Sequence, residues 1–274
     1  MLSRGPRFGA PSAGAAAFAA GASVRTDVAV TIAAPLGSFL GQYIGWRGAF
    51  FFVVPIAVIV FVWQMISLPS MKTASRTSPV AVFNLLKQPI VALGMAAVSI
   101  FFMGQFALFT YLRPFLEIVE HVDVSTLSLL LLGMGVTGFI GTVLIGRFLT
   151  DGLYRTLIVI PILMAFIAAA LIFSAGGIAV TAVLLALWGL FATSAPVGWW
   201  TWIARTLPQD AEAGGGLMVA VVQLAITFGA VVGGVLFDSS GYVATFGVSA
   251  LLLLVAGLLA MQTARKAEPA FQAP

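Results

Sequence analysis

A few side chains in this sequence could bind a ligand, and they stand inside long stretches without charge. Gln105 lies among phenylalanines at helical spacing, which include Phe106 and Phe109. Gln223 and Thr227 lie one helical turn apart in a later stretch. A buried amide or hydroxyl is costly unless it is hydrogen-bonded. Each polar side chain therefore either contacts a ligand or bonds a neighbouring helix, and the phenylalanines either stack on a ligand or pack.

Arg113 and two tryptophans complete the set of candidate binding residues. Arg113 is followed by Pro114, which ends or kinks a helix, and by Glu117 one turn later. An arginine in this position can extend outward and pair with the glutamate, or it can contact a ligand at an outer gate. Trp199 belongs to a group of three tryptophans in four residues, which is typical of an aromatic belt at a membrane boundary. Trp188 and Trp199 could alternatively stack on a ligand.

The elements that must position these residues follow from the hydrophobic pattern. The chain is 61% hydrophobic and 8% charged, which is a composition for lipid and not for water. Its charged residues separate uncharged windows at 28–46, 48–71, 88–112, 124–146, 156–204, 213–237 and 239–264. A helix needs roughly 20 apolar residues to cross a bilayer, so the window 156–204 holds two crossings and each of the others holds one. Since backbone groups in lipid need internal partners and no alternating barrel segments occur, we predict an all-α transmembrane bundle of about eight spans.

The spans divide unequally along the chain. We expect a disordered or non-native leader at 1–27, two helices within 28–68, a cytoplasmic linker at 69–89, a six-helix unit at 90–262 and a cytoplasmic tail at 263–274. The six helices are predicted at about 90–112, 124–146, 156–174, 178–200, 214–237 and 241–262. Small residues let helices approach closely, so the glycines at 133, 135, 138 and 141 predict tight packing.

The net charge of +4 indicates topology better than a nucleic-acid partner, because the thirteen Lys and Arg are scattered over the loops. If the linker faces the cytoplasm, eight basic residues lie inside and two approach the outside, a strong positive-inside bias. The inner set is Lys72, Arg76, Lys87, Arg147, Arg155, Arg205, Arg265 and Lys266, and the outer set is Arg47 and Arg113. We therefore predict a multi-pass protein of the cell's inner membrane with both termini in the cytoplasm.

Enzyme chemistry is not expected. The sequence has no cysteine, and its one histidine, His121, lies in a loop between Glu120 and Asp123. This histidine is read as a surface residue, with a pH sensor as the alternative. Neither a zinc-binding HExxH motif nor a phosphate-binding GxxxxGK[ST] loop occurs. No cofactor and no metal site are predicted.

Several motifs resemble the major facilitator superfamily of secondary transporters. The segments IAAPLGSFLGQYIGWRGAFFF (32–52) and GRFLTDGLYRT (146–156) are similar to its fifth-to-sixth helix region and to its loop between helices eight and nine. Three more segments, with the first, resemble bacterial purine ribonucleoside efflux permeases of the drug:proton antiporter branch. They are GQFALFTYLRPF (104–115), APVGWWTWIARTL (195–207) and VAVVQLAITFGAVVGGVLFD (219–238). The resemblance covers about residues 30–262.

This resemblance implies a function and a truncation. The spans would correspond to helices five to twelve of twelve, so the chain would be an N-terminally truncated form that does not transport alone. Its full-length parent would export small solutes, purine nucleosides above all, in exchange for protons. A nucleoside offers ring nitrogens and ribose hydroxyls to Gln105 and a flat face to phenylalanine.

Two alternatives for the function stay open. The solute could be a drug, a sugar or another small molecule, or the chain could be a non-transporting membrane fragment. No Asp or Glu lies within the uncharged windows, and the resemblance implies that the proton site belongs to the missing N-terminal half. The expected partners are membrane lipid, a small-molecule substrate and protons, without nucleic acid.

Overall fold

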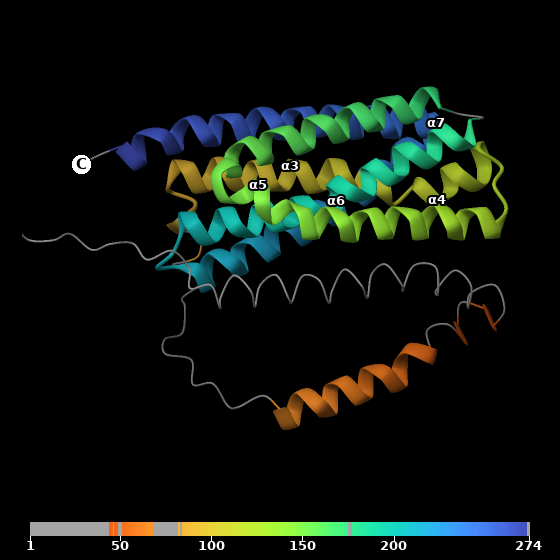
Figure 1. Cartoon of the computed structure of the whole chain (residues 1–274), viewed down its shortest axis with the longest axis horizontal. Coiled ribbons are helices and arrows are strands. Elements are labelled where there is room, and N and C mark those ends of the chain that lie inside the picture. The colour runs from red at the N-terminus through yellow and green to blue at the C-terminus, as the bar shows by residue number, and fades with distance from the viewer. Residues whose placement is uncertain are drawn as a thin grey trace, which may run out of the picture.

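All regular secondary structure among the described residues is helical. A computed structural model describes residues 44, 45, 47, 48, 51–67, 82, 84–174 and 177–272. Its elements are an apolar helix Phe51–Ser67, α3 (Pro89–Phe109), α4 (Leu112–Pro114), the π-helix η1 (Phe115–Val119), α5 (Val124–Phe173), α6 (Ile178–Thr206) and α7 (Ala211–Gln272). The prediction of an all-α transmembrane bundle is confirmed over these residues (Figure 1).

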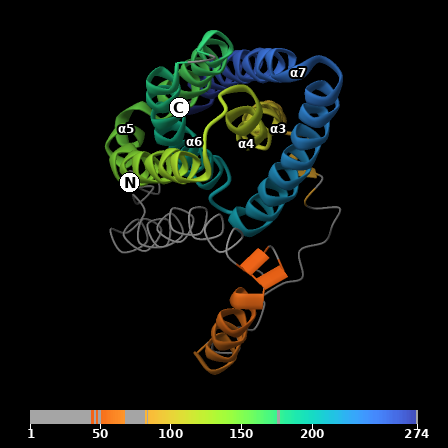
Figure 2. The same cartoon turned by 90° about the vertical axis from the view of Figure 1, so that its right-hand side faces the viewer.

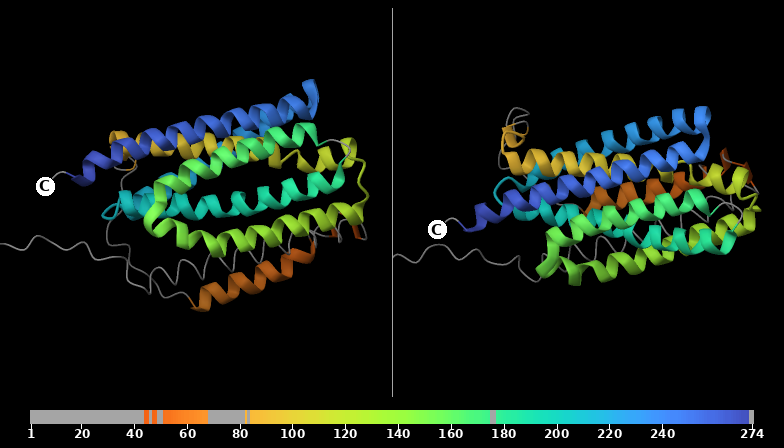
Figure 3. Two further views of the ribbon diagram at one scale, coloured as in Figure 1. Left: turned by 45° about the horizontal axis from the view of Figure 1, so that its top comes forward. Right: turned by 90° about the horizontal axis from the view of Figure 1, so that it is seen from above.

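Two of the long helices fold back on themselves at glycines. Gly152 divides α5 into Val124–Thr150 and Gly152–Phe173, with φ −130° and ψ 33°. Gly241 divides α7, and its φ of 75° lies in the left-handed region that favours glycine. Figure 3 shows the two arms of α5 running in opposite directions. Within residues 84–174 and 177–272, the chain therefore forms six helices of membrane-spanning length.

The first of the six helices is interrupted near its end, which the sequence did not predict beyond a kink at Pro114. Regular α-helix stops at Phe109, and Tyr111 has φ −102° and ψ 8° before the chain resumes as α4 and η1. Tyr111 is held in place by α7, because its hydroxyl donates to the Ala230 carbonyl at 3.1 Å and its ring stacks on Phe237 at 5.4 Å. The break thus lies where the helix is tied to its neighbour.

The described part of the N-terminal region is one short helix. Phe51–Ser67 is apolar, and all its side chains are exposed. Its 17 residues extend about 26 Å, slightly less than a bilayer core of roughly 30 Å. The described residues exclude the leader 1–27, most of the first of the two helices predicted within 28–68, and about two thirds of the linker 69–89. The total of eight spans thus stays a prediction.

The helix α3 lies in the middle of the bundle, with α5, α6 and α7 around it (Figure 2). Its closest neighbour is α7. A Cβ atom added at Gly229 or Gly233 of α7 would overlap the backbone carbonyl of Met103 or Ala107. The Ser249 hydroxyl of α7 also donates to the Gly104 carbonyl at 2.7 Å. Glycine is therefore required where α7 crosses α3, since close backbone approach is what drives helix association in lipid.

The glycines predicted to pack closely do so at two positions. A Cβ at Gly138 would press on Thr193, and one at Gly141 would overlap the Leu190 carbonyl, so both glycines bring α5 against α6. The prediction is wrong for Gly133, which is exposed and would have nothing within 4 Å of an added Cβ. The run of glycines spans both a packed and an open face of the same helix.

The alternating direction of the helices sorts the described charges into two groups. Basic residues gather at the end where α3 begins and α6 ends, whereas acidic residues occur at both ends. The basic end holds Lys87, Arg147, Arg155, Arg205, Arg265 and Lys266 together with the acids Asp151, Asp210, Glu212 and Glu268, and the other end holds Glu117, Glu120, Asp123 and Asp238 with Arg113. Among the latter, Asp123 caps α5, and its hydrogen bonds from the Thr126 hydroxyl and from backbone N–H groups lower its pKa.

A glycine substitution tests the packing of α7 on α3. We expect Gly229→Ala to destabilise the purified protein by about 1–3 kcal/mol, because the added methyl overlaps a backbone carbonyl that cannot move alone. The measurement is thermal unfolding in detergent. Gly247→Ala is the matched control on the same helix, since nothing lies within 4 Å of its added methyl. Equal unfolding temperatures for the two variants would contradict this packing.

Candidate solute-binding cavity

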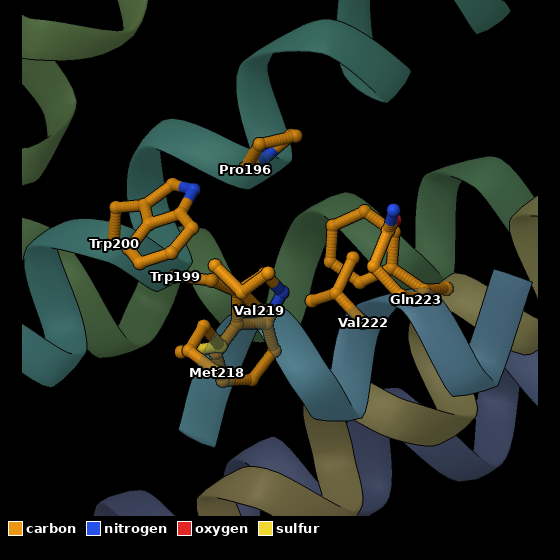
Figure 4. A pocket seen from close by; sticks show the side chains of 8 residues that line it. Pro196, Trp199, Trp200, Met218, Val219, Val222 and Gln223 are labelled. Carbon is orange, nitrogen blue, oxygen red and sulfur yellow. The ribbon is translucent and has the colours of Figure 1, made fainter. Parts of the chain in front are cut away.

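A cavity of about 210 Å³ opens between α3, α6 and α7. Aromatic and aliphatic side chains form most of its wall, and Gln223 supplies the amide among the lining residues. The lining residues are Phe102, Pro196, Trp199, Trp200, Met218, Val219, Val222 and Gln223 (Figure 4). A mostly apolar wall with a few polar groups is typical of a small-molecule site.

The phenylalanines of α3 form a ladder that starts at the cavity. Phe102 lines the cavity and stacks on Phe106 with ring centroids 6.5 Å apart. Phe106 in turn meets Phe109 edge-to-face at 5.7 Å. Exposure increases along the ladder, because Phe102 is buried and Phe109 is 41% exposed. Phe106 and Phe109 thus continue the cavity wall toward the surface of the bundle without lining the cavity itself.

Of the two contacts considered for Gln105, a ligand or a neighbouring helix, the structure contains the hydrogen bond to a neighbouring helix. The Nε2 atom of Gln105 donates to the Ala192 carbonyl of α6 at 3.4 Å. This carbonyl lacks its usual partner in the helix, because the residue four positions later is Pro196, which has no N–H. The Oε1 atom of Gln105 is buried and has no hydrogen-bond partner among the described residues. The amide therefore joins two helices, and its acceptor has no partner among the described residues.

Trp188 lies deeper in the bundle than the cavity. A Cβ at Gly94 would overlap the Trp202 ring, and Gln105 reaches Ala192, so α3 and α6 run antiparallel in this register. Trp188 lies one turn from Ala192, beyond the level of Gln105. It is fully buried, and its indole N–H has no hydrogen-bond partner among the described residues. Trp188 does not line the cavity, whereas Trp199 does.

The remaining predicted residues lie on the surface of the bundle. Gln223 is exposed and lines the cavity, and the Thr227 hydroxyl donates to the Gln223 carbonyl of its own helix at 2.9 Å. Thr227 is exposed and outside the cavity lining. Arg113 is exposed and pairs with Glu117, with Nε and Oε1 2.8 Å apart. The structure therefore contains the ion pair that was one of the two interpretations of Arg113.

The cavity thus unites two of the predicted residues, Trp199 and Gln223, and places the others around it or away from it. Phe102, Pro196 and Trp200 belong to aromatic and proline-containing runs that the sequence displays, so they could have been included. Met218, Val219 and Val222 could not, because an apolar residue in an apolar helix carries no signal of a cavity. Within the described residues, no group of His, Asp or Glu could hold a metal ion.

Comparisons with known proteins agree with this architecture. The family model described as the Major Facilitator Superfamily matches residues 15–215. The chain is 56% identical over 247 residues to a Pseudomonas aeruginosa protein named transcription regulatory protein OpdE, a match that covers 89% of this chain and 61% of that protein. It is 40% identical over 233 residues to the purine ribonucleoside efflux pump NepI of Salmonella enteritidis, covering 85% and 59% of the two chains. The chain thus spans about three fifths of the length of these relatives.

The exposed ion pair between Arg113 of α4 and Glu117 of η1 should contribute little to the free energy of unfolding. We expect a coupling energy below about 1 kcal/mol between Arg113 and Glu117, because the two side chains are 57% and 39% exposed. A double-mutant cycle with Arg113→Ala and Glu117→Ala, measured by unfolding in mixed micelles, gives this value directly. A coupling of several kcal/mol would indicate a buried gate in place of a solvated pair.

Proposed function

Because the chain belongs to the major facilitator superfamily, whose members are membrane transporters and not enzymes, we propose that it serves proton-coupled efflux of purine nucleosides. The observation that carries the proposal is the cavity itself, an aromatic and aliphatic wall with an amide at its edge, in a chain 40% identical to a purine ribonucleoside efflux pump. The coarser conclusion, a multi-pass membrane protein of an efflux-transporter family, rests on the family and on the apolar helices.

The chemistry of a nucleoside suits the groups around the cavity. Aromatic rings prefer stacked or edge-to-face partners, and the purine base presents a flat face to Phe102 or Trp199, which line the cavity. The Gln223 amide donates and accepts hydrogen bonds, which matches ring nitrogens and ribose hydroxyls. The unpartnered Oε1 of Gln105 offers a further acceptor. Shape and hydrogen bonds, and not charge, would then select the solute.

In this proposal, the cavity is part of a larger transport path, and the residues that line it form one side of that path. The cavity volume of 210 Å³ is less than the roughly 300–1,000 Å³ of typical ligand sites. Secondary transporters place the solute between two halves that rock against each other. We assign residues 90–262 to the C-terminal half and 28–68 to two helices of the N-terminal half. Helices outside this chain would supply the opposite wall.

Orientation and coupling follow from the charges. The basic end of the bundle would face the cytoplasm, by the positive-inside rule, with both termini inside and the protein in the inner membrane. Proton coupling needs an acid that alternately faces each side of the membrane. Within the described helices, no Asp or Glu lies between 213 and 237, where α7 crosses, nor between 89 and 109 in α3. The coupling acid is therefore assigned to the N-terminal half.

A second candidate function is suggested by the name of the 56% identical relative, a transcription regulatory protein. An exporter can change transcription without touching DNA if it lowers the internal concentration of an inducing solute. Deletion of the gene would then change transcription only while that solute is present. A change that persists without the solute would instead support a regulatory role independent of transport.

Export can be tested by nucleoside resistance. We expect a strain that lacks its own exporter to survive inosine or guanosine better when it expresses this chain joined to the part of the Salmonella pump that the match leaves uncovered. The chain alone, expressed to the same level, is the second arm. Equal sensitivity of the joined protein and the empty vector would refute nucleoside export, and resistance to drugs or sugars alone would favour the other solute classes.

The cavity amide should matter for the solute and not for the fold. In the joined protein, we expect Gln223→Leu to lower nucleoside export by about tenfold, the loss of one well-formed hydrogen bond, while thermal stability stays unchanged because the side chain is exposed. Gln262→Leu is the matched control, an exposed amide on the same helix that does not line the cavity. Export would be measured with radiolabelled inosine in inverted vesicles. Equal rates for the two variants would remove Gln223 from the site.

A further inference from the structure

Pro196 leaves a structural weak point in the middle of α6, and that point lies at the cavity. The proline lines the cavity together with Trp199 and Trp200. Because proline has no N–H, the Ala192 carbonyl cannot receive its normal helical hydrogen bond. A helix is easily bent where such a bond is missing. The part of α6 after Pro196 carries the two tryptophans, so a bend there would move the cavity wall.

Two neighbouring helices supply hydrogen bonds to this weak turn. From α3, the Gln105 amide donates to the Ala192 carbonyl at 3.4 Å. From α5, the Thr142 hydroxyl donates to the next carbonyl, that of Thr193, also at 3.4 Å. Thr193 returns a bond of 2.7 Å from its own hydroxyl to the Gly138 carbonyl. The turn before the proline is therefore held from both sides.

The two clamping bonds are long, and one clamping group is only half satisfied. Hydrogen bonds are commonest near 2.9–3.0 Å from N–H groups and near 2.7–2.8 Å from hydroxyls, so both contacts of 3.4 Å are weak. The buried Oε1 of Gln105 has no partner among the described residues. Rotation of the amide therefore breaks only the weak bond from Nε2 to the Ala192 carbonyl. Hydroxyls of Thr193 and Thr201 also bond carbonyls one turn back in α6, an arrangement that often bends helices.

We propose that Pro196 is a hinge of α6 and that Gln105 is the positioning residue that holds it. The amide caps the carbonyl that the proline frees, and Thr142 supports the adjacent carbonyl. When the amide turns away, α6 bends at Pro196 and carries Trp199 and Trp200 with it. The hinge belongs to the six-helix bundle itself, and it goes beyond the proposed function because it is independent of which solute is transported.

The position of the α6 end can be measured with spin labels, since the chain contains no cysteine. We would place labels at Ala204→Cys on α6 and Leu258→Cys on α7, both exposed positions. From Pro196 to Ala204 the helix extends about 12 Å, so a swing of about 20° moves the label by about 4 Å. Pulsed electron resonance on the full chain in nanodiscs resolves such a change without any solute.

The test compares the parent with four variants, all carrying these labels. We expect Gln105→Leu to broaden the distance distribution by about 4 Å, and Pro196→Ala to keep it narrow, because alanine restores the N–H for the Ala192 carbonyl. The double variant should match Pro196→Ala alone, which a general packing defect at Gln105 would not produce. Gln262→Leu, an exposed amide on α7, is the control and should leave the distribution unchanged.

Two results would overturn the hinge. One is a Gln105→Leu distribution as narrow as that of the parent, and the other is a double variant as broad as Gln105→Leu. If Gln105→Leu does not fold, Thr142→Val removes the second bond and is compared with and without Pro196→Ala by the same criteria. Because no solute is present, failure of nucleoside export leaves these outcomes unaffected, and failure of the hinge leaves the export assay unaffected.

Discussion

The structure depends on one constraint, which is that every backbone polar group in a lipid-embedded helix must find its partner within the protein. Hydrogen bonds within the helices satisfy most of these groups. Serine and threonine hydroxyls also find their partners inside the protein, because they donate to backbone carbonyls of their own helix. Among the described residues, the hydroxyls of ten bond carbonyls of their own helix four positions earlier. These residues are Thr150, Thr156, Thr193, Ser194, Thr201, Thr206, Thr227, Ser239, Thr245 and Thr263. Pro196 cannot donate to the Ala192 carbonyl, so this carbonyl receives its hydrogen bond from Gln105 of α3. The helix α3 must therefore lie close to α6 at this point.

The same constraint explains why glycine is placed where it is. Helices in lipid have no hydrophobic effect to draw them together, so they need close backbone approach. Gly229 and Gly233 admit α3, while Gly138 and Gly141 admit α6. The Gln105 amide reaches the Ala192 carbonyl because α3 and α6 also approach closely where Gly94 lies against the Trp202 ring. The cavity forms on the remaining side of this arrangement, between α3, α6 and α7.

How much of this the sequence could reveal depends on the kind of signal. The six described helices were predictable because charged residues bound each apolar window and 156–204 is long enough for two crossings. The turn at Gly152 falls between two windows, and Gly241 is the first residue of the span predicted at 241–262. The ligand residues were harder. Position 192 follows from Pro196 by helical spacing, but its partner Gln105 depends on the register between α3 and α6, which neither sequence segment contains. The break at Tyr111 likewise depends on a hydrogen bond and a stacked ring from α7.

If the cavity binds the solute of the proposed function, its composition would limit which solutes fit. A charged side chain facing the membrane interior is costly unless it is paired, and the described cavity wall contains none. A neutral, flat solute with several hydrogen-bonding groups would lose little free energy on leaving water for this wall. Aromatic rings would pack against its faces, and the Gln223 amide would replace hydrogen bonds that it made to water. A permanently charged solute would leave its charge without a partner on this wall. In the proposed export function, a wall without charge around Trp199 and Gln223 would favour a neutral solute, and a charge used in coupling would act from another part of the path.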